Sequence, residues 1–387
     1  MPFWTADARP LSSWGQKGTP IIAEPYASAG SVLEIDLGAL VANWRQLRDL
    51  HGQGRDTAAV LKADGYGLGA SRVASALYKA GCRHIFTAHL MEAVAIRHSA
   101  PDAMLSVLHG LGPGEERDFI AHRLVPALGS LAEIEAWGRA AAGLGQPLPA
   151  LLHIDTGMNR TGLSPEALAR LIAEPTRLQG IDLRYVMTHL VSADIPGAPI
   201  NLQQARRFAA VAAHFPTAQR CFANSSGLFL GPDFASDLAR PGAALYGINP
   251  IPDAPNPMRA VARLSARIMQ IRDIPAGESV GYDRQWVATR PSRIATLPIG
   301  YADGYHRALS GKAAVAFGGQ LCPVVGRISM DLITVDVTDC PAAVLGAWME
   351  VIGPTIPPER LARLAGTNAY EILTSLGRRF HRVYLEA

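Results

Sequence analysis

Short apolar runs alternate with amphipathic runs from about residue 31 to residue 255. The apolar runs are bounded by turn residues, which is typical of buried parallel strands, and the segments between them have the spacing of helices with one apolar face. The expected strands are residues 58–63, 84–88, 104–108, 124–128, 149–154, 184–188, 220–223 and 243–246. The expected helices include residues 72–79, 132–142, 165–172 and 202–214. About eight β-α units in succession favour a closed (β/α)8 TIM barrel over an open doubly wound sheet, which usually has fewer repeats.

The pattern changes after residue 257. Strand-like runs separated by turns with Gly or Pro follow at residues 264–274, 293–299, 313–317, 332–337 and 348–352, and one helix is expected at 359–364. Such a series indicates a mostly antiparallel β-domain. We therefore expect three parts. They are an irregular N-terminal extension over residues 1–30, which is rich in Pro, Gly and Ser, the barrel over 31–257, and a C-terminal β-domain over 258–387.

Composition narrows the possible partners and the compartment. The 387 residues carry a formal net charge of only +3, and their Lys and Arg residues are dispersed, which argues against nucleic acid as a partner. No apolar stretch approaches the roughly 20 residues of a membrane span, and no secretory signal precedes the barrel. The four cysteines, Cys82, Cys221, Cys322 and Cys340, are far apart and lack C-x-x-C spacing. They predict reduced thiols and a cytoplasmic protein.

The chemistry of a parallel barrel takes place at the carboxyl ends of its strands. The polar residues at the expected ends are Lys62, His89, His109, Asp155, His189, Asn224 and Arg240, the last followed by Gly242. Several histidines on barrel strands also suit a metal hydrolase. That class normally has a His-x-His pair on its first strand, where this chain has Lys62, so no metal site is expected.

Lys62 follows an apolar strand and precedes three glycines, Gly65, Gly67 and Gly69, which let backbone amides approach a ligand closely. A desolvated lysine at such a place can lose its proton and form an imine with a carbonyl, which is how pyridoxal phosphate is anchored. A dinucleotide fingerprint is a poorer explanation, because its third glycine would come one residue later and no acid ends the next strand, 84–88. From these residues alone, a solvent-exposed lysine at a strand end remains an alternative.

Eight sequence blocks together resemble the alanine racemase family. They are residues 60–67, 153–162, 187–190, 223–226, 239–247, 280–282, 298–304 and 326–331. They occur in the family order and span nearly the whole chain after residue 30. The resemblance implies a fold-type III pyridoxal 5'-phosphate barrel with a C-terminal β-domain, working as a head-to-tail homodimer with shared active sites.

The resemblance also implies a two-base reaction. Lys62 would hold the cofactor and exchange the α-proton of the D-enantiomer, and Tyr282 of the partner subunit would exchange that of the L-enantiomer. Racemisation requires proton transfer on both faces of one carbon. His189 would contact this tyrosine and Arg240, and Arg240 would face the pyridine nitrogen. An arginine there should disfavour protonation of that nitrogen and suppress transamination.

Further roles implied by the resemblance concern cofactor and substrate. The phosphate group would be held by Tyr66, Ser225, the amides of Gly242 and Ala243, and Tyr370, with Asn224 also at the cofactor. Arg160 would reach the phenolic oxygen of the cofactor and lie near the substrate carboxylate. Met330 would bind that carboxylate through its amide, with Asp331 at the mouth of the site and Tyr301 as a gate.

Two positions depart from the family pattern. His153 stands where several relatives have a carbamylated lysine, and Asp283 follows Tyr282 where small residues are common. The implied function is interconversion of L- and D-alanine, for peptidoglycan or for D-alanine breakdown. A racemase for serine or other small amino acids, a basic amino-acid decarboxylase and a non-catalytic pyridoxal phosphate carrier are the alternatives. The last of these lacks the second domain.

Overall fold

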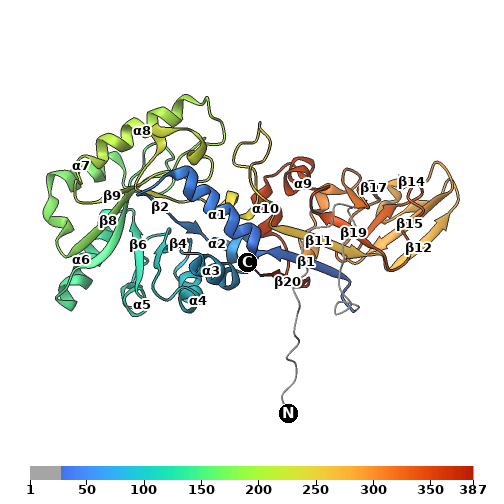
Figure 1. The fold of residues 1–387 in the computed structure, drawn as a ribbon, viewed down its shortest axis with the longest axis horizontal. Coiled ribbons are helices and arrows are strands. Elements are labelled where there is room, and N and C mark those ends of the chain that lie inside the picture. The colour runs from blue at the N-terminus through green and yellow to red at the C-terminus, as the bar shows by residue number, and fades with distance from the viewer. Residues whose placement is uncertain (1–27, 387) are drawn as a thin grey trace, which may run out of the picture. The chain divides into compact units, whose positions relative to one another are not determined.

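The computed structural model describes residues 28–386, which form two compact units (Figure 1). One unit comprises residues 40–259, and the other combines residues 28–39 with residues 260–386. The expected boundaries assigned residues 31–39 to the barrel, and the structure instead includes them in the second unit. Most of the expected N-terminal extension, residues 1–27, lies outside the described residues.

The first unit contains a sheet in which every neighbouring pair is parallel, in the order β2-β10-β9-β8-β7-β6-β5-β4-β3. Its strands are β2 (Asp56–Thr57), β3 (Ala59–Val60), β4 (His84–Thr87), β5 (Met104–Val107), β6 (Leu124–Leu128), β7 (Leu148–His153), β8 (Ile181–Met187), β9 (Gln219–Cys221) and β10 (Leu238–Ala239). Only Ala58 separates β2 from β3, and its N–H donates to the Ala239 carbonyl at 2.9 Å. The two end strands are thus one interrupted strand, and the sheet closes. The expected closed parallel barrel is confirmed.

Helices with one buried face follow most of the strands. They are α1 (Leu37–His51), α3 (Ala70–Lys79), α4 (Leu90–Ile96), α5 (Glu116–Ala121), α6 (Leu131–Leu144), α7 (Pro165–Ala173) and α8 (Pro199–Ala212). Side-chain caps begin two of them: Ser130 accepts the N–H of Glu133 in α6, and Ser164 accepts that of Ala167 in α7. Within residues 28–386, no helix has both the length and the apolar character needed to cross a bilayer.

The expected eighth strand, residues 243–246, is wrong. This segment is the 3₁₀ helix η6 (Ala243–Tyr246), and β10 supplies the strand instead. Pro241 and Gly242 end the strand, and the Ser225 hydroxyl then accepts the N–H groups of Gly242 and Ala244 at 3.0 and 3.2 Å. These bonds stabilise a helical start where the apolar composition had suggested extended chain.

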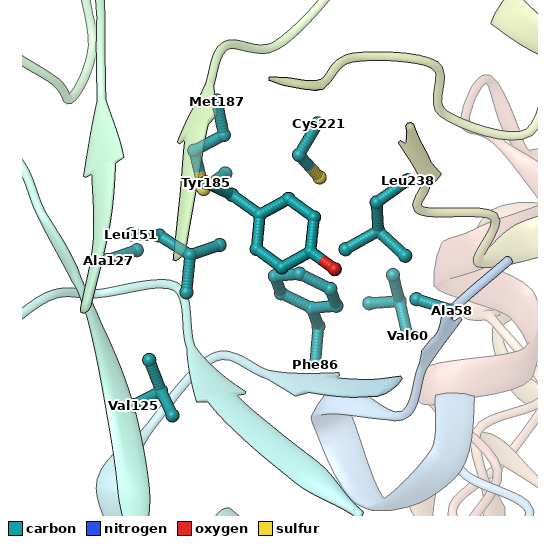
Figure 2. Packing of buried hydrophobic residues seen from close by; sticks show 10 residues of the cluster. All are labelled: Ala58, Val60, Phe86, Val125, Ala127, Leu151, Tyr185, Met187, Cys221 and Leu238. Atoms are coloured by element: carbon teal, nitrogen blue, oxygen red, sulfur yellow. The ribbon is translucent and has the colours of Figure 1, made fainter. Parts of the chain in front are cut away.

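Buried side chains from most of the strands pack together in the barrel interior (Figure 2). Tyr185 from β8 lies among them with Phe86 from β4, and both residues are buried. The remaining members of the cluster are Ala58, Val60, Val125, Ala127, Leu151, Met187, Cys221 and Leu238. The interior is therefore a packed core, which leaves the strand ends as the place for a site.

The second unit is built on a sheet in the order β12-β15-β18-β17-β16-β19-β11-β1-β20. Its strands are β1 (Ser31–Asp36), β11 (Ala262–Arg267), β12 (Gln270–Ile274), β15 (Ser292–Leu297), β16 (Ala314–Phe317), β17 (Gln320–Val325), β18 (Ile333–Asp336), β19 (Trp348–Ile352) and β20 (His381–Leu385). β1 and β20 are parallel, and the other neighbours are antiparallel. The mostly β second domain is confirmed.

β1 is the reason that residues 31–39 belong to the second unit. It pairs with β11 on one side and β20 on the other, so the blue strand in Figure 1 lies between orange and red ones. Two further corrections concern this unit: the expected strand 264–274 is divided into β11 and β12, and β17 and β20 were not expected. The unit also holds the hairpin of β13 (Ser279–Val280) and β14 (Trp286–Val287), and the helices α9 (Pro358–Ala365) and α10 (Ala369–Thr374).

Candidate active site

Lys62 lies two residues after β3 and immediately before a left-handed turn. The following residues, 63–67, all have positive φ, between 54° and 81°. The left-handed conformation costs roughly 1–2 kcal/mol for each non-glycine residue, and Ala63, Asp64 and Tyr66 are such residues. Hydrogen bonds within the segment oppose this strain, among them Gly67 N–H to the Ala63 carbonyl at 2.7 Å. The turn therefore holds Lys62 at the barrel mouth in a conformation that needs support from its surroundings.

The amine of Lys62 is placed to lose its proton. The side chain as a whole is exposed, yet the surrounding protein removes part of the hydration of its amine and lowers its pKa. The charges of Arg160 and Arg240 lower the pKa further, and the Glu92 carboxylate opposes them. An amine of this kind is a nucleophile and a base at a less alkaline pH than an ordinary lysine.

Arg240 is a buried cation, only 3% exposed, directly after β10. Its Nε donates to the Cys221 sulfur at 3.1 Å, and its Nη2 donates to the carbonyls of Thr188 and Phe222. Among its contacts with the described residues there is no carboxylate, and Nη1 donates to none of them. A guanidinium in such surroundings suits a ligand atom that accepts a hydrogen bond.

His189 follows β8 and is held through its backbone. The buried amide of Gln204, in α8, donates to the His189 carbonyl at 2.9 Å and to the Thr156 hydroxyl at 3.0 Å. Burial lowers the pKa of His189 to about 3, and the charge of Arg240 adds to this effect. The imidazole is therefore neutral, so it can exchange hydrogen bonds without adding a cation beside Arg240.

His153, at the end of β7, is also a neutral imidazole. Burial lowers its pKa to about 4, and the nearby charge of Arg240 contributes. A carbamylated lysine at this position would carry a negative charge toward Arg160, which His153 cannot supply. The loop that carries Arg160 is instead organised by Asp155, whose carboxylate accepts the N–H groups of residues 157, 158 and 159 at 2.8, 2.9 and 2.8 Å.

Ser225, Gly242 and Tyr66 form a small polar cradle. Both acceptor positions of the Ser225 hydroxyl are taken by the N–H groups of Gly242 and Ala244, so its remaining capacity is to donate. A Cβ at Gly242 would lie 2.4 Å from the Tyr66 hydroxyl, so any larger residue there would displace Tyr66. Ala243 is the first residue of η6, where the N–H has no partner within the helix. Hydroxyls and a helix-start N–H that converge in this way suit a phosphate group.

The side chain of Asn224 makes a hydrogen bond within its own loop: its oxygen accepts the Gly227 N–H at 2.8 Å.

Two histidines at neighbouring strand ends, His89 and His109, lie edge to face with ring centres 4.3 Å apart. Partial burial lowers the pKa of His109, and the charge of Lys62 is among the further causes. Both rings therefore line the same mouth, although no role was expected for either.

The remaining expected residues belong to the β unit. Tyr282 stands at the tip of the β13–β14 hairpin in the short helix η7 (Tyr282–Arg284) and is 68% exposed. The next residue, Asp283, has a φ of 57° and forms an ion pair with Arg327. The hairpin tip is thus held by the segment that follows β17, while the phenol itself extends into solvent.

Arg379 joins the two loops that carry Tyr301 and Met330. It donates to both carboxylate oxygens of the buried Asp303, at 2.7 and 3.0 Å, and to Asp331 at 2.7 Å. The backbone N–H of Tyr301 also bonds to the Ser329 carbonyl at 3.0 Å. The segments 300–304 and 329–331 are therefore held against each other, with the side chains of Tyr301 and Met330 exposed.

The structure divides the expected site residues into two groups, one in each unit, and within the β unit hydrogen bonds join the segments 300–304 and 329–331. The barrel group comprises Lys62, Tyr66, Arg160, His189, Asn224, Ser225, Arg240, Gly242 and Ala243. The β-unit group comprises Tyr282, Tyr301, Met330, Asp331 and the exposed Tyr370 of α10. Three residues that organise these groups were not expected: Glu92, Gln204 and Arg379. The sequence carried a signal only for Glu92, which occupies the third position of a helix that begins after β4.

A closed parallel barrel, a lysine amine of lowered pKa at its mouth and a separate β-sheet unit together define a barrel enzyme that works through a lysine. Comparison with known proteins makes this assignment specific. Residues 35–250 match the model of the alanine racemase N-terminal domain, and residues 261–384 match that of the C-terminal domain.

Similar proteins agree with the family models. The chain is 54% identical to an alanine racemase from Acidiphilium cryptum over 91% of this chain and 98% of that protein. It is 46% identical to one from Brucella abortus over 92% of this chain and 94% of the relative. The crystal structure of the Bartonella henselae alanine racemase with covalently bound pyridoxal phosphate superposes with a TM-score of 0.89 at 41% identity, covering 92% and 99% of the two chains. The chain belongs to the alanine racemase family.

Proposed function

We propose that this protein interconverts L- and D-alanine, with pyridoxal 5'-phosphate held covalently on Lys62. The observation that carries the proposal is the pair of cations at the barrel mouth: a lysine whose pKa is lowered, beside a buried Arg240 that contacts no carboxylate among the described residues. Membership of the alanine racemase family and the cofactor bound in the Bartonella henselae relative support it.

Pyridoxal phosphate, when bound, supplies an aldehyde that captures amines and a ring that withdraws electrons from the bonds to Cα. The barrel residues fit this group. The hydroxyl of Ser225 and the N–H of Ala243 suit its phosphate, with Tyr66 and Gly242 completing the cradle. Arg240 suits a ring nitrogen that accepts a hydrogen bond, and His189 stays neutral beside it. Asn224 and Tyr370 remain expected cofactor contacts.

In the proposed reaction, Lys62 and Tyr282 exchange the α-proton on opposite faces of Cα. Lys62 suits this task because partial burial and the charges of Arg160 and Arg240 lower the pKa of its amine. Arg240 would donate to the ring nitrogen of the bound cofactor and disfavour its protonation, which would limit electron withdrawal and therefore side reactions at the cofactor carbon. Arg160 and the Met330 amide orient the substrate carboxylate, Asp331 shapes the mouth of the site, and Tyr301 keeps the space beside Cα small.

We further propose that two copies of the chain assemble head to tail, each lending Tyr282 to the other's site. The exposure of this phenol, 68% on an otherwise ordered hairpin, supports a role that a second copy completes. The alternative of a serine or broader small-amino-acid racemase differs only in the space beside Cα. The proposed setting is the cytoplasm, with D-alanine used for peptidoglycan or broken down.

One experiment tests substrate and reaction together. Purified, cofactor-loaded protein is incubated with each L-amino acid separately, and the products are separated by chiral chromatography. D-Alanine should form fastest. Faster formation of D-serine would replace the substrate assignment, and the absence of any D-amino acid would overturn the reaction.

Subunit exchange tests the shared site. The variants Lys62→Ala and Tyr282→Phe should each be inactive, and a mixture should regain up to about a quarter of the activity, because half of the mixed dimer's sites are intact and random exchange gives about half mixed dimers. Failure to regain activity after exchange has been verified by mass would contradict the head-to-tail assembly.

A further inference from the structure

Glu92 makes an unusual set of contacts at the barrel mouth. It is the third residue of α4, and its carboxylate accepts three backbone N–H groups. Oε1 accepts from Ala63 at 2.7 Å, and Oε2 accepts from Ala88 and His89 at 2.9 and 3.1 Å. The bonds to Ala88 and His89 cap the start of α4. The bond to Ala63 leaves that helix and reaches the residue next to Lys62.

The N–H of Ala63 is the first one in the left-handed turn. The turn's own bonds join Gly65 N–H to the Leu61 carbonyl at 2.9 Å and Gly67 N–H to the Ala63 carbonyl at 2.7 Å. Like the first N–H of any helical turn, that of Ala63 points away from these bonds and needs an outside acceptor. The Asp64 carboxylate ties the far end, where it accepts the Ala70 N–H at 2.8 Å. Glu92 therefore holds the end of the turn that carries Lys62.

We propose that Glu92 is a positioning residue for Lys62: its carboxylate fastens the start of the strained left-handed turn to β4 and α4, and so determines where the lysine amine stands. The proposal deepens the proposed function and rests on it, since Lys62 is the expected cofactor anchor. A carboxylate is needed because three N–H groups point at it. A glutamine would turn its NH₂ group toward at least one of these donors.

Glu133 provides a matched control. It is the third residue of α6, and its Oε2 accepts the Gly129 N–H at 2.8 Å while its Oε1 accepts from the Ser130 hydroxyl at 3.1 Å. The contacts resemble the cap that Glu92 makes on α4, but they remain within the loop before α6. Glu133→Gln should therefore weaken a barrel helix start without reaching the turn of Lys62.

The test compares Glu92→Gln, Glu133→Gln and the double variant Ala63→Gly/Glu92→Gln with the wild type. Two readouts apply to the full-length protein as purified. The first is hydrogen–deuterium exchange of the amides of residues 63–67. The second is the rate at which hydroxylamine releases the cofactor as the oxime, with Lys62 returned as the free amine. Both report on the turn without depending on turnover.

Glu92→Gln should speed both processes roughly tenfold or more, because a hydrogen bond to a charged group is lost from a strained segment. Glu133→Gln should leave both rates within about twofold of the wild type. Glycine adopts positive φ without strain, so the double variant should recover most of the protection. Unchanged exchange in Glu92→Gln, or an equal increase in Glu133→Gln, would overturn the proposal. A wild type without cofactor or racemase activity would contradict the proposed function instead, and hydrogen exchange would still decide the role of Glu92.

Discussion

The two units prepare their site residues in opposite ways. In the barrel, functional groups are surrounded by protein. Arg240 is buried, and His189 is held through Gln204. Burial lowers the pKa values of His153 and His189. In the β unit, the side chains of Tyr282, Tyr301 and Met330 are exposed, and only the backbone around them is held.

This difference separates two kinds of preorganisation. The barrel adjusts protonation, because burial and neighbouring cations determine which groups carry charge. The β unit adjusts position, because ion pairs such as those of Arg379 hold loops while their side chains remain open to a ligand or to another protein surface. Substitutions in the barrel should therefore change chemistry, and substitutions in the β unit should change direction, fit or affinity.

The largest effect is expected for Lys62→Ala. The variant loses the only side chain expected to hold the cofactor covalently, so both directions of racemisation should fall below detection. The variant should also retain no cofactor after denaturation, which mass spectrometry of the borohydride-reduced protein measures. A covalent adduct in this variant would mean that another residue is the anchor.

Tyr282→Phe should affect the two enantiomers unequally. Loss of a proton-transfer group typically lowers a rate by 10²–10⁴-fold, and this loss should fall on the α-proton of L-alanine. Exchange of the D-alanine α-proton with solvent deuterium should persist, because Lys62 remains. NMR measurement of both exchange rates provides the comparison, and equal losses would count against separate bases.

Arg240→Glu should change the outcome of the reaction more than its rate. A carboxylate opposite the ring nitrogen favours its protonation, which strengthens electron withdrawal and favours transamination. The measurement is pyruvate released per racemisation cycle, which should rise at least tenfold, the equivalent of about 1.4 kcal/mol. Arg240→Lys retains the positive charge and serves as the control. If Arg240→Glu releases no more pyruvate per racemisation cycle than the wild type, Arg240 does not suppress transamination through the ring nitrogen.

Arg379→Lys should have a smaller effect, confined to substrate affinity. An ammonium cannot reproduce the forked contacts to Asp303 and Asp331, so the segment 329–331 should loosen. We expect KM for alanine to rise several-fold while kcat changes less than twofold. Stability should change little, because the side chain is 53% exposed.

Arg378→Lys is the matched control for Arg379. Arg378 is the neighbouring residue, it is exposed, and it has no ion pair with the described residues. The test is to measure kcat and KM for alanine in both variants by steady-state kinetics. If kcat and KM respond alike in the two, the ion pairs of Arg379 do not position the loop.

The sequence predicted much of this arrangement, and its failures have physical causes. The strand that ends before Lys62 and the blocks around His189 and Arg240 were readable, because alternating strands and helices leave polar residues at strand ends. The left-handed turn could not be predicted, since Ala63, Asp64 and Tyr66 do not favour positive φ and a bond from distant Glu92 helps to maintain it.

Contacts between segments distant in the chain could not be predicted from the sequence either. Nothing near residues 31–36 indicates that this strand pairs with β20, some 350 residues later in the chain. Arg378 and Arg379 are adjacent, and the local sequence does not indicate which of the two arginines contacts Asp303. The segment 243–246 was misassigned because its apolar composition concealed a helix start capped by Ser225.

The smallest expected effect concerns acid stability and the barrel's neutral imidazoles. His153 has a folded-state pKa of about 4, below the usual value of about 6.5. The unfolded chain therefore binds a proton that the folded chain excludes between these values, and stability falls as the pH drops through this window. One such group contributes a slope of up to about 1.4 kcal/mol per pH unit.

The variant His153→Gln removes this titrating group. Urea unfolding of the variant between pH 6 and pH 5 should therefore show a shallower loss of stability than that of the wild type. Any destabilisation from the substitution itself shifts both measurements equally and leaves the difference intact. An unaltered slope would mean that His153 binds its proton as readily in the folded protein as in the unfolded chain.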